Sequence, residues 1–371
     1  SLIYGASLGG RCRYDLGLFE VDERSALRVY PYLKPDYMLI TNLSRDSIMR
    51  NAHPEYIRDI LTKYIPKETK LILNADDLIC CGIAPENPRV YFGIEKMDTD
   101  VTDCVNLIND LQICPQCHRR LEYEYRRYNH IGRAYCPHCG FKAPAYDYAG
   151  CHVDLDKMRI DVRDAAGIGH YRLLNESIFN IYNVVSAVAL LREIGYSHAQ
   201  IEAFFAKLNI VGSRYDVETI GSRTLYRLLA KEKNAFATTR VFDYISGLDG
   251  DKEIILMNSC QGDMKHWSEN TCWLYDCDFE FLNQDNIKNI ILCGPRRFDH
   301  KLRLLLAGVP EEKLSFAEKE TDAPDKLRLF ANDQIYVLYG TDSIALGKKV
   351  ADQVRTLLIA KNKEEGEADE N

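Results

Sequence analysis

Four cysteines in two closely spaced pairs constrain this chain more than any other feature of its sequence. Cys114 and Cys117 form one CxxC pair, and Cys136 and Cys139 form a second one 18 residues later. Zinc prefers four soft ligands in a tetrahedron, and each CxxC turn presents two thiolates to one side of the ion. The spacing therefore predicts a structural zinc ribbon over residues 113–140 with these cysteines as ligands. A redox-active pair of dithiols is the alternative interpretation.

The other nine of the 13 cysteines are scattered, and most lie in apolar runs. The count is odd, the chain is too long for a disulfide scaffold, and we see no signal peptide at its start. Reduced thiols in a cytoplasmic protein are therefore the favoured interpretation. No run approaches the ~18 apolar residues of a membrane span, so we expect no transmembrane segment.

The charge balance argues against a dedicated nucleic-acid binder. The chain has 47 basic and 55 acidic residues, a formal net charge of −8, and we expect no nucleic-acid partner. The loop between the cysteine pairs nevertheless mixes basic and aromatic residues, a composition that can bind polyanions. A solvated, exposed ribbon is the favoured interpretation of that loop. The residues concerned are Arg119, Arg120, Arg126, Arg127, Arg133, Tyr123, Tyr125 and Tyr128.

Short apolar runs alternate with amphipathic stretches in the first half of the chain, which predicts a parallel sheet covered by helices. We expect buried strands at Tyr14–Val21, Tyr37–Asn42, Lys70–Asn74 and Val90–Ile94, and a helix at Pro54–Tyr64. After the ribbon, the alternation in His152–Val162 and the glycines at 167 and 169 predict antiparallel strands. Glu176–Gly195 and His198–Leu208 are expected to be helical.

The second half restarts the alternation after an expected linker at Asn209–Asp216. Strands are expected at Glu253–Met257, Asn289–Cys293 and Gln334–Leu338, and helices at Ala235–Leu248, Phe298–Ala307 and Ser343–Ala360. This pattern predicts a second doubly wound α/β domain. We therefore expect one domain at 1–210, a second at 211–360, and a disordered, charged tail at 361–371.

Common phosphate-binding and zinc-protease motifs are absent from the sequence. It contains no GxxxxGK[ST] loop, no GxGxxG turn and no HExxH. On its residues alone, a nucleotide-binding role would not be suspected.

Several segments together, in order along the chain, resemble the Mur ligases. They are Glu20-Val21-Asp22-Glu23, Pro35 to Asp46, Asn74-Ala75-Asp76-Asp77, Tyr91-Phe92-Gly93, Asn180-Ile181-Tyr182-Asn183, Ser213-Arg214 and Trp273 to Glu280. The inserted four-cysteine ribbon and the last segment are similar to the MurT subfamily. The resemblance implies an α/β fold: a Mur ligase central domain with an inserted four-cysteine zinc ribbon, followed by a C-terminal doubly wound α/β domain.

The same resemblance implies an activity in peptidoglycan biosynthesis. The subfamily is the ligase-like subunit of lipid II isoglutaminyl synthase and pairs with a GatD-like glutaminase. It uses ATP and Mg²⁺ to convert the α-carboxylate of the stem-peptide D-glutamate to an acyl phosphate, which ammonia from the partner turns into D-isoglutamine. The substrate, lipid II, lies at the cytoplasmic face of the membrane. Another Mur-type amino-acid ligase and a non-catalytic zinc-ribbon binding protein are the alternatives.

Site residues follow from the resemblance position by position. Glu20 matches the magnesium-binding glutamate, Asn180 and Asn183 match the nucleotide-contacting helix, and Arg214 matches an ATP-side arginine. Asp276 and Asp278 lie in the segment whose acid assists the glutaminase. The family's phosphate loop should precede Glu20, yet the nineteen residues before it hold no such motif, so we expect the chain to lack that segment through N-terminal truncation.

Overall fold

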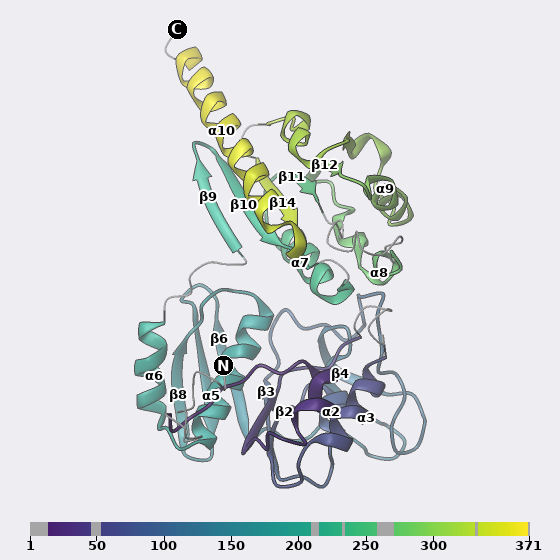
Figure 1. Cartoon of the computed structure of the whole chain (residues 1–371), viewed down its shortest axis with the longest axis vertical. Coiled ribbons are helices and arrows are strands. Elements are labelled where there is room, and N and C mark those ends of the chain that lie inside the picture. Colours follow the sequence, from purple (N-terminus) through teal and green to yellow (C-terminus); the bar gives the residue numbers. More distant parts are fainter. Residues whose placement is uncertain are drawn as a thin grey trace.

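Two six-stranded sheets, each covered by helices, carry the fold (Figure 1). The computed structural model describes residues 14–45, 53–208, 215–231, 234–257, 271–330 and 333–369. The first sheet and its helices form the central domain, and the second sheet forms the C-terminal domain. Among the described residues, no helix is both long and apolar enough to cross a membrane.

The central sheet is parallel through its first four strands and antiparallel at its far edge. Its order is β1-β2-β3-β6-β7-β8. Buried residues alternate along β2, so that Leu71 and Leu73 face one core cluster while Ile72 faces the other. The strands are β1 (Tyr37–Ile40), β2 (Lys70–Asn74), β3 (Arg89–Ile94), β6 (Tyr148–Asp154), β7 (Arg159–Asp164) and β8 (Gly167–Arg172).

Helices cover both faces of this sheet. The long helix α5 packs across strands β1, β2, β3, β6 and β7, because its Ile181, Val185 and Val188 are fully buried. Ser197 and Gln200 form a capping box that begins α6,. The helices are η1 (Glu23–Ser25), α2 (Ala26–Val29), α3 (Pro54–Tyr64), α4 (Leu78–Cys81), α5 (Ile178–Glu193) and α6 (His198–Lys207).

The cysteine-bearing segment lies between β3 and β6 in the sequence and forms a separate two-stranded antiparallel sheet. Its strands are β4 (Glu122–Tyr128) and β5 (Ile131–Tyr135). Asn129 and His130 make the tight turn between them, with Asn129 at a positive φ of 45°. This insert is called the ribbon below, and residues 128–131 are called the ribbon turn.

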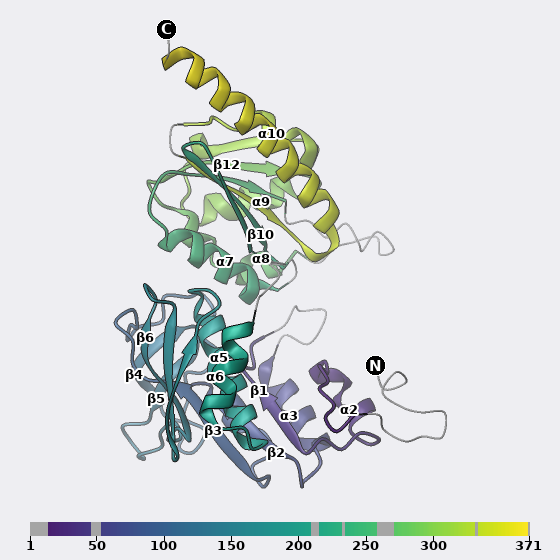
Figure 2. The same cartoon turned by 90° about the vertical axis from the view of Figure 1, so that its left-hand side faces the viewer.

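The C-terminal sheet has the order β13-β12-β11-β14-β10-β9 and is parallel except for the edge strand β9. Helices α7, α8 and α9 pack on one face, and α10 runs across the other and extends beyond the sheet (Figure 2). The strands are β9 (Tyr215–Ile220), β10 (Arg223–Leu229), β11 (Lys252–Leu256), β12 (Ile287–Cys293), β13 (Leu314–Ala317) and β14 (Gln334–Tyr339). The helices are α7 (Ala235–Gly247), α8 (Trp273–Asp276), η4 (Phe279–Leu282), α9 (Arg297–Leu306), η5 (Glu311–Lys313), η6 (Glu320–Asp322), η7 (Pro324–Lys326), η8 (Thr341–Ser343) and α10 (Ile344–Asp369).

Three expectations differ from this fold. Tyr14–Val21 is not a strand: residues 14–20 are exposed and pair with no described strand, so its apolar alternation has no sheet to join. His152–Val162 is interrupted by a turn at 155–158 and divides between β6 and β7. The tail expected to be disordered continues α10 as far as Asp369.

Charge pairing accounts for the helical tail. Arg223, which is only 1% exposed, donates to both oxygens of Glu365 at 2.8 and 2.9 Å. Lys361 and Glu364 form a further pair at 3.4 Å. The Arg223 contact holds this charged segment against the sheet, and the Lys361–Glu364 pair supports the helix itself,.

Candidate functional site at the carboxyl edge of the central sheet

The carboxyl ends of the parallel strands bring two acidic residues to one edge of the central sheet. Asp76 and Asp77 directly follow β2, and both side chains are completely buried. In open parallel sheets, ligands bind outside the carboxyl ends of the strands. Asn74, the last residue of β2, donates from its side chain to the carbonyl of Thr41 after β1 at 2.9 Å, which ties the two strand ends together.

Asp76 accepts hydrogen bonds from three separate segments. Tyr182 of α5 donates its hydroxyl at 2.7 Å, Tyr146 donates at 2.5 Å, and the Ile94 amide donates at 3.1 Å. Arg127 of the ribbon adds an ion pair at 3.0 Å. The segments Asn74–Asp77, Asn180–Asn183 and the ribbon, which lie far apart in the sequence, therefore meet at one carboxylate.

The Arg127 guanidinium is surrounded by hydrogen-bond acceptors and carboxylates. Its terminal nitrogens donate to Asp76, to the Tyr182 hydroxyl and to the carbonyls of Ile94 and Glu95, and its Nε lies 3.1 Å from Asp100. Burial alone would lower the pKa of Arg127, but Tyr182, Asp76 and Asp100 outweigh it and raise the pKa. The ribbon thus contributes a permanent, buried positive charge to this edge.

Asp77 organises the neighbouring loop. One of its oxygens accepts from the amides of Ile79 and Cys80 and so caps α4, while the other accepts from the Leu43 amide at 2.7 Å. The buried His130 of the ribbon turn lies 3.3 Å away. Burial opposes charge on both partners, yet their mutual attraction prevails, lowering the pKa of Asp77 and raising that of His130.

The four cysteines of the ribbon converge on one point. Their sulfur atoms all lie within 4.8 Å of one another, with Sγ–Sγ distances of 3.6 Å for Cys114 and Cys139 and 3.4 Å for Cys117 and Cys136. A tetrahedral zinc ion with Zn–S bonds of about 2.3 Å needs ligand separations of ~3.8 Å. The donor set and its spacing therefore fit zinc, with no ligand position left for water.

The two cysteine pairs have nearly the same backbone geometry. His118 and Gly140 follow the second cysteine of each pair at φ of 57° and 76°, and each amide donates to the carbonyl of the first cysteine, at 3.0 and 3.1 Å. Burial raises the pKa of Cys136, but the amides of Cys139 and His138 and the neighbouring thiols outweigh it and lower the pKa to about 7. This favours the thiolate that a metal ligand requires.

The basic and aromatic residues of the ribbon mostly face inward. Arg126 is 8% exposed and lies 3.5 Å above the Tyr123 ring, and Arg127 is buried as described above. Arg133 donates to the carbonyls of Ala143 and Pro144 and lies 4.5 Å from the Tyr146 ring. These side chains stabilise the ribbon rather than forming a polyanion-binding surface.

The two acids of the C-terminal motif have different surroundings. Asp278 is 2% exposed and accepts from the Leu107 amide at 2.6 Å and the Asn106 side chain at 2.9 Å, both of the central domain. Burial raises the pKa of Asp278. Asp276 ends α8 with a side chain that is 32% exposed, and it lies 3.6 Å from Arg45 of the central domain.

The expected nucleotide and magnesium residues do not form a constellation in the described chain. Glu20 lies on an exposed segment before η1. Asn180 is 8% exposed and donates to the Asn175 carbonyl at 3.1 Å, while Asn183 is exposed on the same helix. Arg214 lies outside the described residues. The roles given to these four residues stay predictions.

Sequence reasoning missed the residues that hold this edge together, namely Asp76, Arg127, Tyr182 and Asn106. Asp76 and Tyr182 stand inside segments that carry the family resemblance, so the resemblance is the signal that could have found them. Arg127 and Asn106 had no such signal, because their partners lie 51 and 172 residues away in the sequence.

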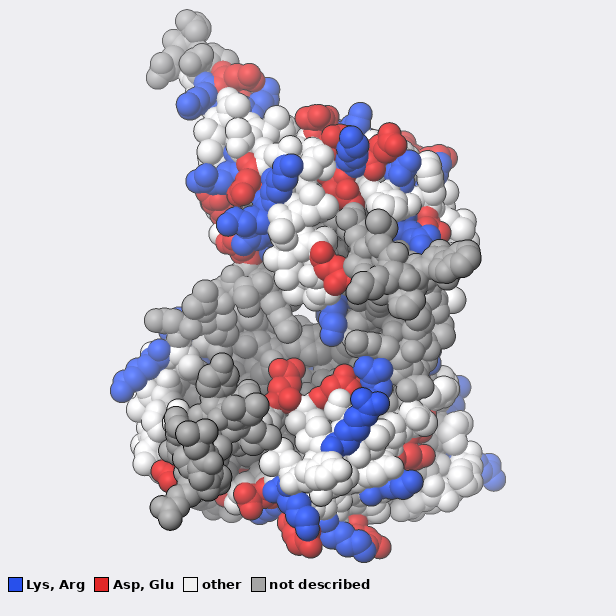
Figure 3. Space-filling model, in the orientation of Figure 1, with Lys and Arg blue, Asp and Glu red and all other residues white. Residues whose placement is uncertain are grey.

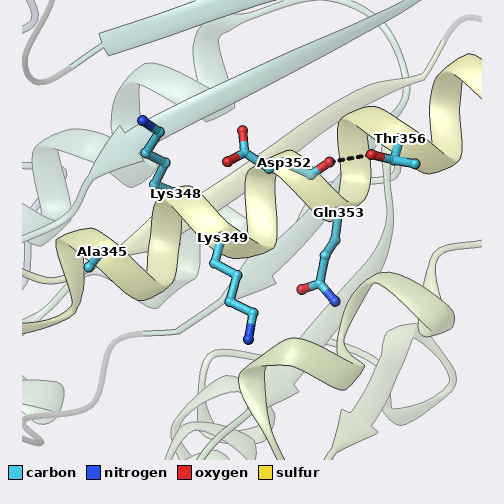
Figure 4. Close-up of a pocket in the computed structure, with 6 residues that line it drawn as sticks. All are labelled: Ala345, Lys348, Lys349, Asp352, Gln353 and Thr356. Atoms are coloured by element: carbon cyan, nitrogen blue, oxygen red, sulfur yellow. Dashed lines mark hydrogen bonds between the residues drawn. The ribbon is translucent and has the colours of Figure 1, made fainter.

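One surface hollow lies apart from the predicted site residues. A shallow hollow of about 360 Å³ follows α10 and is lined by exposed side chains of that single helix (Figure 4). Basic and acidic residues are interspersed over the described surface of the C-terminal domain in the view of Figure 3. None of the predicted site residues lines the hollow, which comprises Ala345, Lys348, Lys349, Asp352, Gln353 and Thr356.

Solved structures define the class of fold. The pseudomurein peptide ligase type C of Methanothermus fervidus superposes with a TM-score of 0.65 at 19% identity, over 90% of this chain and 65% of that one. MurF of Acinetobacter baumannii gives a TM-score of 0.55 at 13% identity, over 87% and 60%. MurF of Thermotoga maritima in complex with ADP gives 0.51 at 9% identity, over 88% and 63%. The chain has the fold of a Mur ligase, as its sequence predicts.

Sequence comparisons find similarity to MurT. Residues 232–341 match the family model described as MurT ligase C-terminal. The chain is 28% identical to the MurT subunit of lipid II isoglutaminyl synthase (glutamine-hydrolyzing) of Staphylococcus aureus, over 79% of this chain and 65% of that protein. The Streptococcus pneumoniae MurT subunit is also 28% identical, over 81% and 66%. The predicted similarity to MurT is confirmed, and the chain spans about two thirds of the length of these relatives.

Proposed function

We propose that this chain is the ligase-like subunit of a two-subunit enzyme that amidates the α-carboxylate of D-glutamate in the lipid II stem peptide. The observation that carries the proposal is a MurT ligase C-terminal domain at residues 232–341 on a Mur ligase fold. The ribbon supports it, because its four sulfurs converge in the arrangement that zinc requires,.

The proposed chemistry needs an activated carboxylate. A carboxylate becomes a good acyl donor only when one oxygen is made a leaving group, here by phosphoryl transfer from ATP, with Mg²⁺ neutralising the phosphates. Ammonia from a GatD-like glutaminase partner then displaces the phosphate. The acidic carboxyl edge around Asp76 and Asp77 is the expected place for this chemistry, with Glu20 toward the magnesium ion and Asn180, Asn183 and Arg214 toward the nucleotide.

Exclusion of water is the main task of the two domains in this reaction. An acyl phosphate hydrolyses in water, so closure of the domains would protect it. The segment around Arg214, between α6 and β9, connects the two sheets and is the proposed hinge.

Of Asp276 and Asp278, we assign to Asp276 the role of assisting the glutaminase partner. Both carboxylate oxygens of Asp278 already accept hydrogen bonds from the central domain, so a partner would have to break them. The carboxylate of Asp276 stays partly exposed beside Arg45. A partner can therefore reach Asp276 without disturbing the domain arrangement.

Reconstitution tests the proposal. The full reading frame that contains this chain is co-purified with a GatD-like glutaminase and incubated with lipid II, glutamine, ATP and Mg²⁺. Amidation is read as the replacement of a stem-peptide hydroxyl by an amino group in the mass spectrum, together with release of phosphate. The proposal fails if the purified complex binds ATP yet leaves lipid II unchanged.

The variant Asp276→Asn separates the two half-reactions. It should abolish glutamine-dependent amidation while added ammonium salts still support the reaction, because only the partner's hydrolysis of glutamine is affected. Asp285→Asn, at another exposed acid of the C-terminal domain, is the matched control and should retain both activities. Equal loss with glutamine and with ammonium would remove Asp276 from the proposed role.

A further inference from the structure

A segment of the central domain that precedes the first cysteine pair packs into the core of the C-terminal domain. Ile108 is 5% exposed and belongs to the core cluster that contains Trp273, Leu274 and Phe279 of the C-terminal domain. Residues 104–111, called the bridging segment here, thus pack against residues more than 160 positions away along the chain. This contact is independent of the covalent connection between α6 and β9.

Hydrogen bonds to a buried carboxylate reinforce that packing. Asp278 accepts from the Asn106 side chain at 2.9 Å and from the Leu107 amide at 2.6 Å, while its own amide donates to Thr239 at 2.9 Å. A buried carboxylate needs such donors, because losing one leaves a charge without solvation. Asp278 is therefore a polar anchor between the domains.

The ribbon turn holds the other side of the bridging segment. The amide of Asn129 donates to the Asn106 side-chain oxygen at 2.7 Å, and the Asn129 side chain donates to the Ile108 carbonyl at 3.0 Å. Asn106 thus joins Asn129 to Asp278 through its two amide atoms. The next residue of the turn, His130, pairs with Asp77 at the carboxyl edge of the central sheet.

We propose that the ribbon is an interdomain latch, in which Asn106 is the positioning residue that couples the metal-bound ribbon to the Asp278 segment. The metal closes the base of the β4–β5 hairpin, the hairpin fixes its turn, and the turn presents Asn106 to Asp278. Loss of the metal releases residues 273–282 from the central domain, although they lie outside the ribbon. The inference rests on these contacts and not on the proposed ligase activity.

Hydrogen exchange measures this coupling without any enzymatic assay. In the zinc-loaded chain, Asn106→Ala should speed amide exchange across 104–111 and 273–282 by about tenfold to a hundredfold, the effect of losing a hydrogen bond to a buried charge. Zinc content should be unchanged, and so should exchange at residues 114–139 apart from the Asn129 amide, which loses its acceptor on Asn106. Asn87→Ala removes an equally buried asparagine with two hydrogen bonds inside the central domain and should leave 273–282 protected.

Removal of zinc by a chelator is the second test of this coupling. Chelation should expose 273–282 in the wild-type chain but add little in Asn106→Ala, where the latch is already open, while β12 stays protected in both. If chelation unfolds the whole chain, the zinc-loaded comparison decides alone. Unchanged exchange of 273–282 in zinc-loaded Asn106→Ala would overturn the proposal.

A double variant that swaps the carboxylate and the amide between positions 106 and 278 tests the positioning role of Asn106 directly. The double variant Asn106→Asp with Asp278→Asn keeps one carboxylate and one amide at the contact, and it preserves acceptors for the amides of Leu107 and Asn129. Wild-type protection of 273–282 should return in the double variant and be absent from Asn106→Asp alone, where two carboxylates face each other. If the double variant exchanges as fast as Asn106→Asp alone, the specific contact proposed here is wrong.

Discussion

At the scale of single residues, the central domain contains a buried ion pair in which the carboxylate and both terminal guanidinium nitrogens have hydrogen-bond partners. The side chains of Arg127 and Asp76 are 2% and 0% exposed. Two tyrosine hydroxyls and an amide also donate to Asp76. Breaking such a pair by removing one partner is costly because it leaves an uncompensated charge in the interior.

We therefore expect Arg127→Ala to lower the free energy of unfolding by about 3–5 kcal/mol, the typical cost of leaving one partner of a buried pair alone. Urea unfolding followed by circular dichroism measures it. Arg163→Ala removes a surface arginine paired with Glu95 and should cost less than about 1 kcal/mol. Similar losses for the two variants would contradict the role assigned to Arg127.

A second buried carboxyl responds to pH. The Asp333 side chain is completely buried and lies beside Glu253. Burial, together with the charge and hydrogen bonding of Glu253, raises the pKa of Asp333 to about 7. Glu253 accepts from the amides of Arg328 and Leu329 and from the side chain of Asn289, so its carboxylate is held in place beside Asp333.

The raised pKa makes the C-terminal domain less stable as pH rises. The folded state retains a proton that the unfolded state releases near its ordinary value, so stability is full below that value and is lost as pH rises through about 7. The slope should approach 1.4 kcal/mol per pH unit at most. The free energy of unfolding of wild type and Asp333→Asn, measured at about pH 5.5 and about pH 8, tests this. The wild type should lose more stability than Asp333→Asn between the two pH values. Equal losses in the two proteins would refute the assignment.

At the scale of elements, we expect the stability of the ribbon to depend on a zinc ion held by its four cysteines. Cys114→Ser removes a fully buried ligand and should release zinc, loosening the hairpin and the bridging segment together. Metal analysis of the purified variant measures the loss. Cys272→Ser, at an exposed cysteine outside the cluster, should keep the metal, and full zinc in Cys114→Ser would refute the ligand assignment.

Elements with a local signal were predictable from the sequence. The strand Lys70–Asn74 was predicted because a strand buried on both faces has a continuous apolar run,. The helix Pro54–Tyr64 was predicted because proline is common at the first position of a helix,. Tyr14–Val21 carries an equally apolar run without a strand to pair with. The α10 tail was missed because Arg223, which pairs with Glu365, lies 142 residues away.

The candidate site was predictable only in part, for the same reason. The cysteine spacing is a local signal, and it predicted which four cysteines lie together. The inward orientation of Arg127 and the link from Asn106 to Asp278 depend on how the ribbon folds back onto the sheet, which no local pattern encodes. The chain-long resemblance to MurT supplied what periodicity did not.

At the scale of the whole molecule, the two domains meet through aromatic rings and one incompletely paired cation. Tyr128 of the ribbon contacts Phe179 of α5 and Phe236 of α7, with ring centroids 5.0 and 5.5 Å apart. Arg240 of α7 lies 4.7 Å from the Tyr128 ring and pairs with Asp243 at 3.2 Å. Its Nε and Nη2 are buried and have no hydrogen-bond partner in the described residues.

This interface therefore carries a larger cost than the Arg127 site, where only Nε lacks a hydrogen bond in the described residues and still lies 3.1 Å from an Asp100 carboxylate oxygen. Each buried donor without an acceptor costs about 1–3 kcal/mol, whereas the ring contacts return roughly 2 kcal/mol. Burial also lowers the pKa of Arg240. We expect Arg240→Met, which keeps the stem and removes the donors, to leave the free energy of unfolding within about 1 kcal/mol of wild type or to raise it.

The comparison with Arg127 makes this prediction decisive, since both arginines are buried and both lie against tyrosine rings. Urea unfolding of Arg240→Met beside Arg127→Met should show a loss only for the second. If Arg240→Met is as destabilising as Arg127→Met, the two donors are satisfied in solution and the interface holds no such cost. A further outcome is that Arg240→Met keeps its stability but fails in domain closure or amidation. In that case the Arg240 guanidinium acts in a different arrangement of the two domains, and that role explains why an arginine is present here.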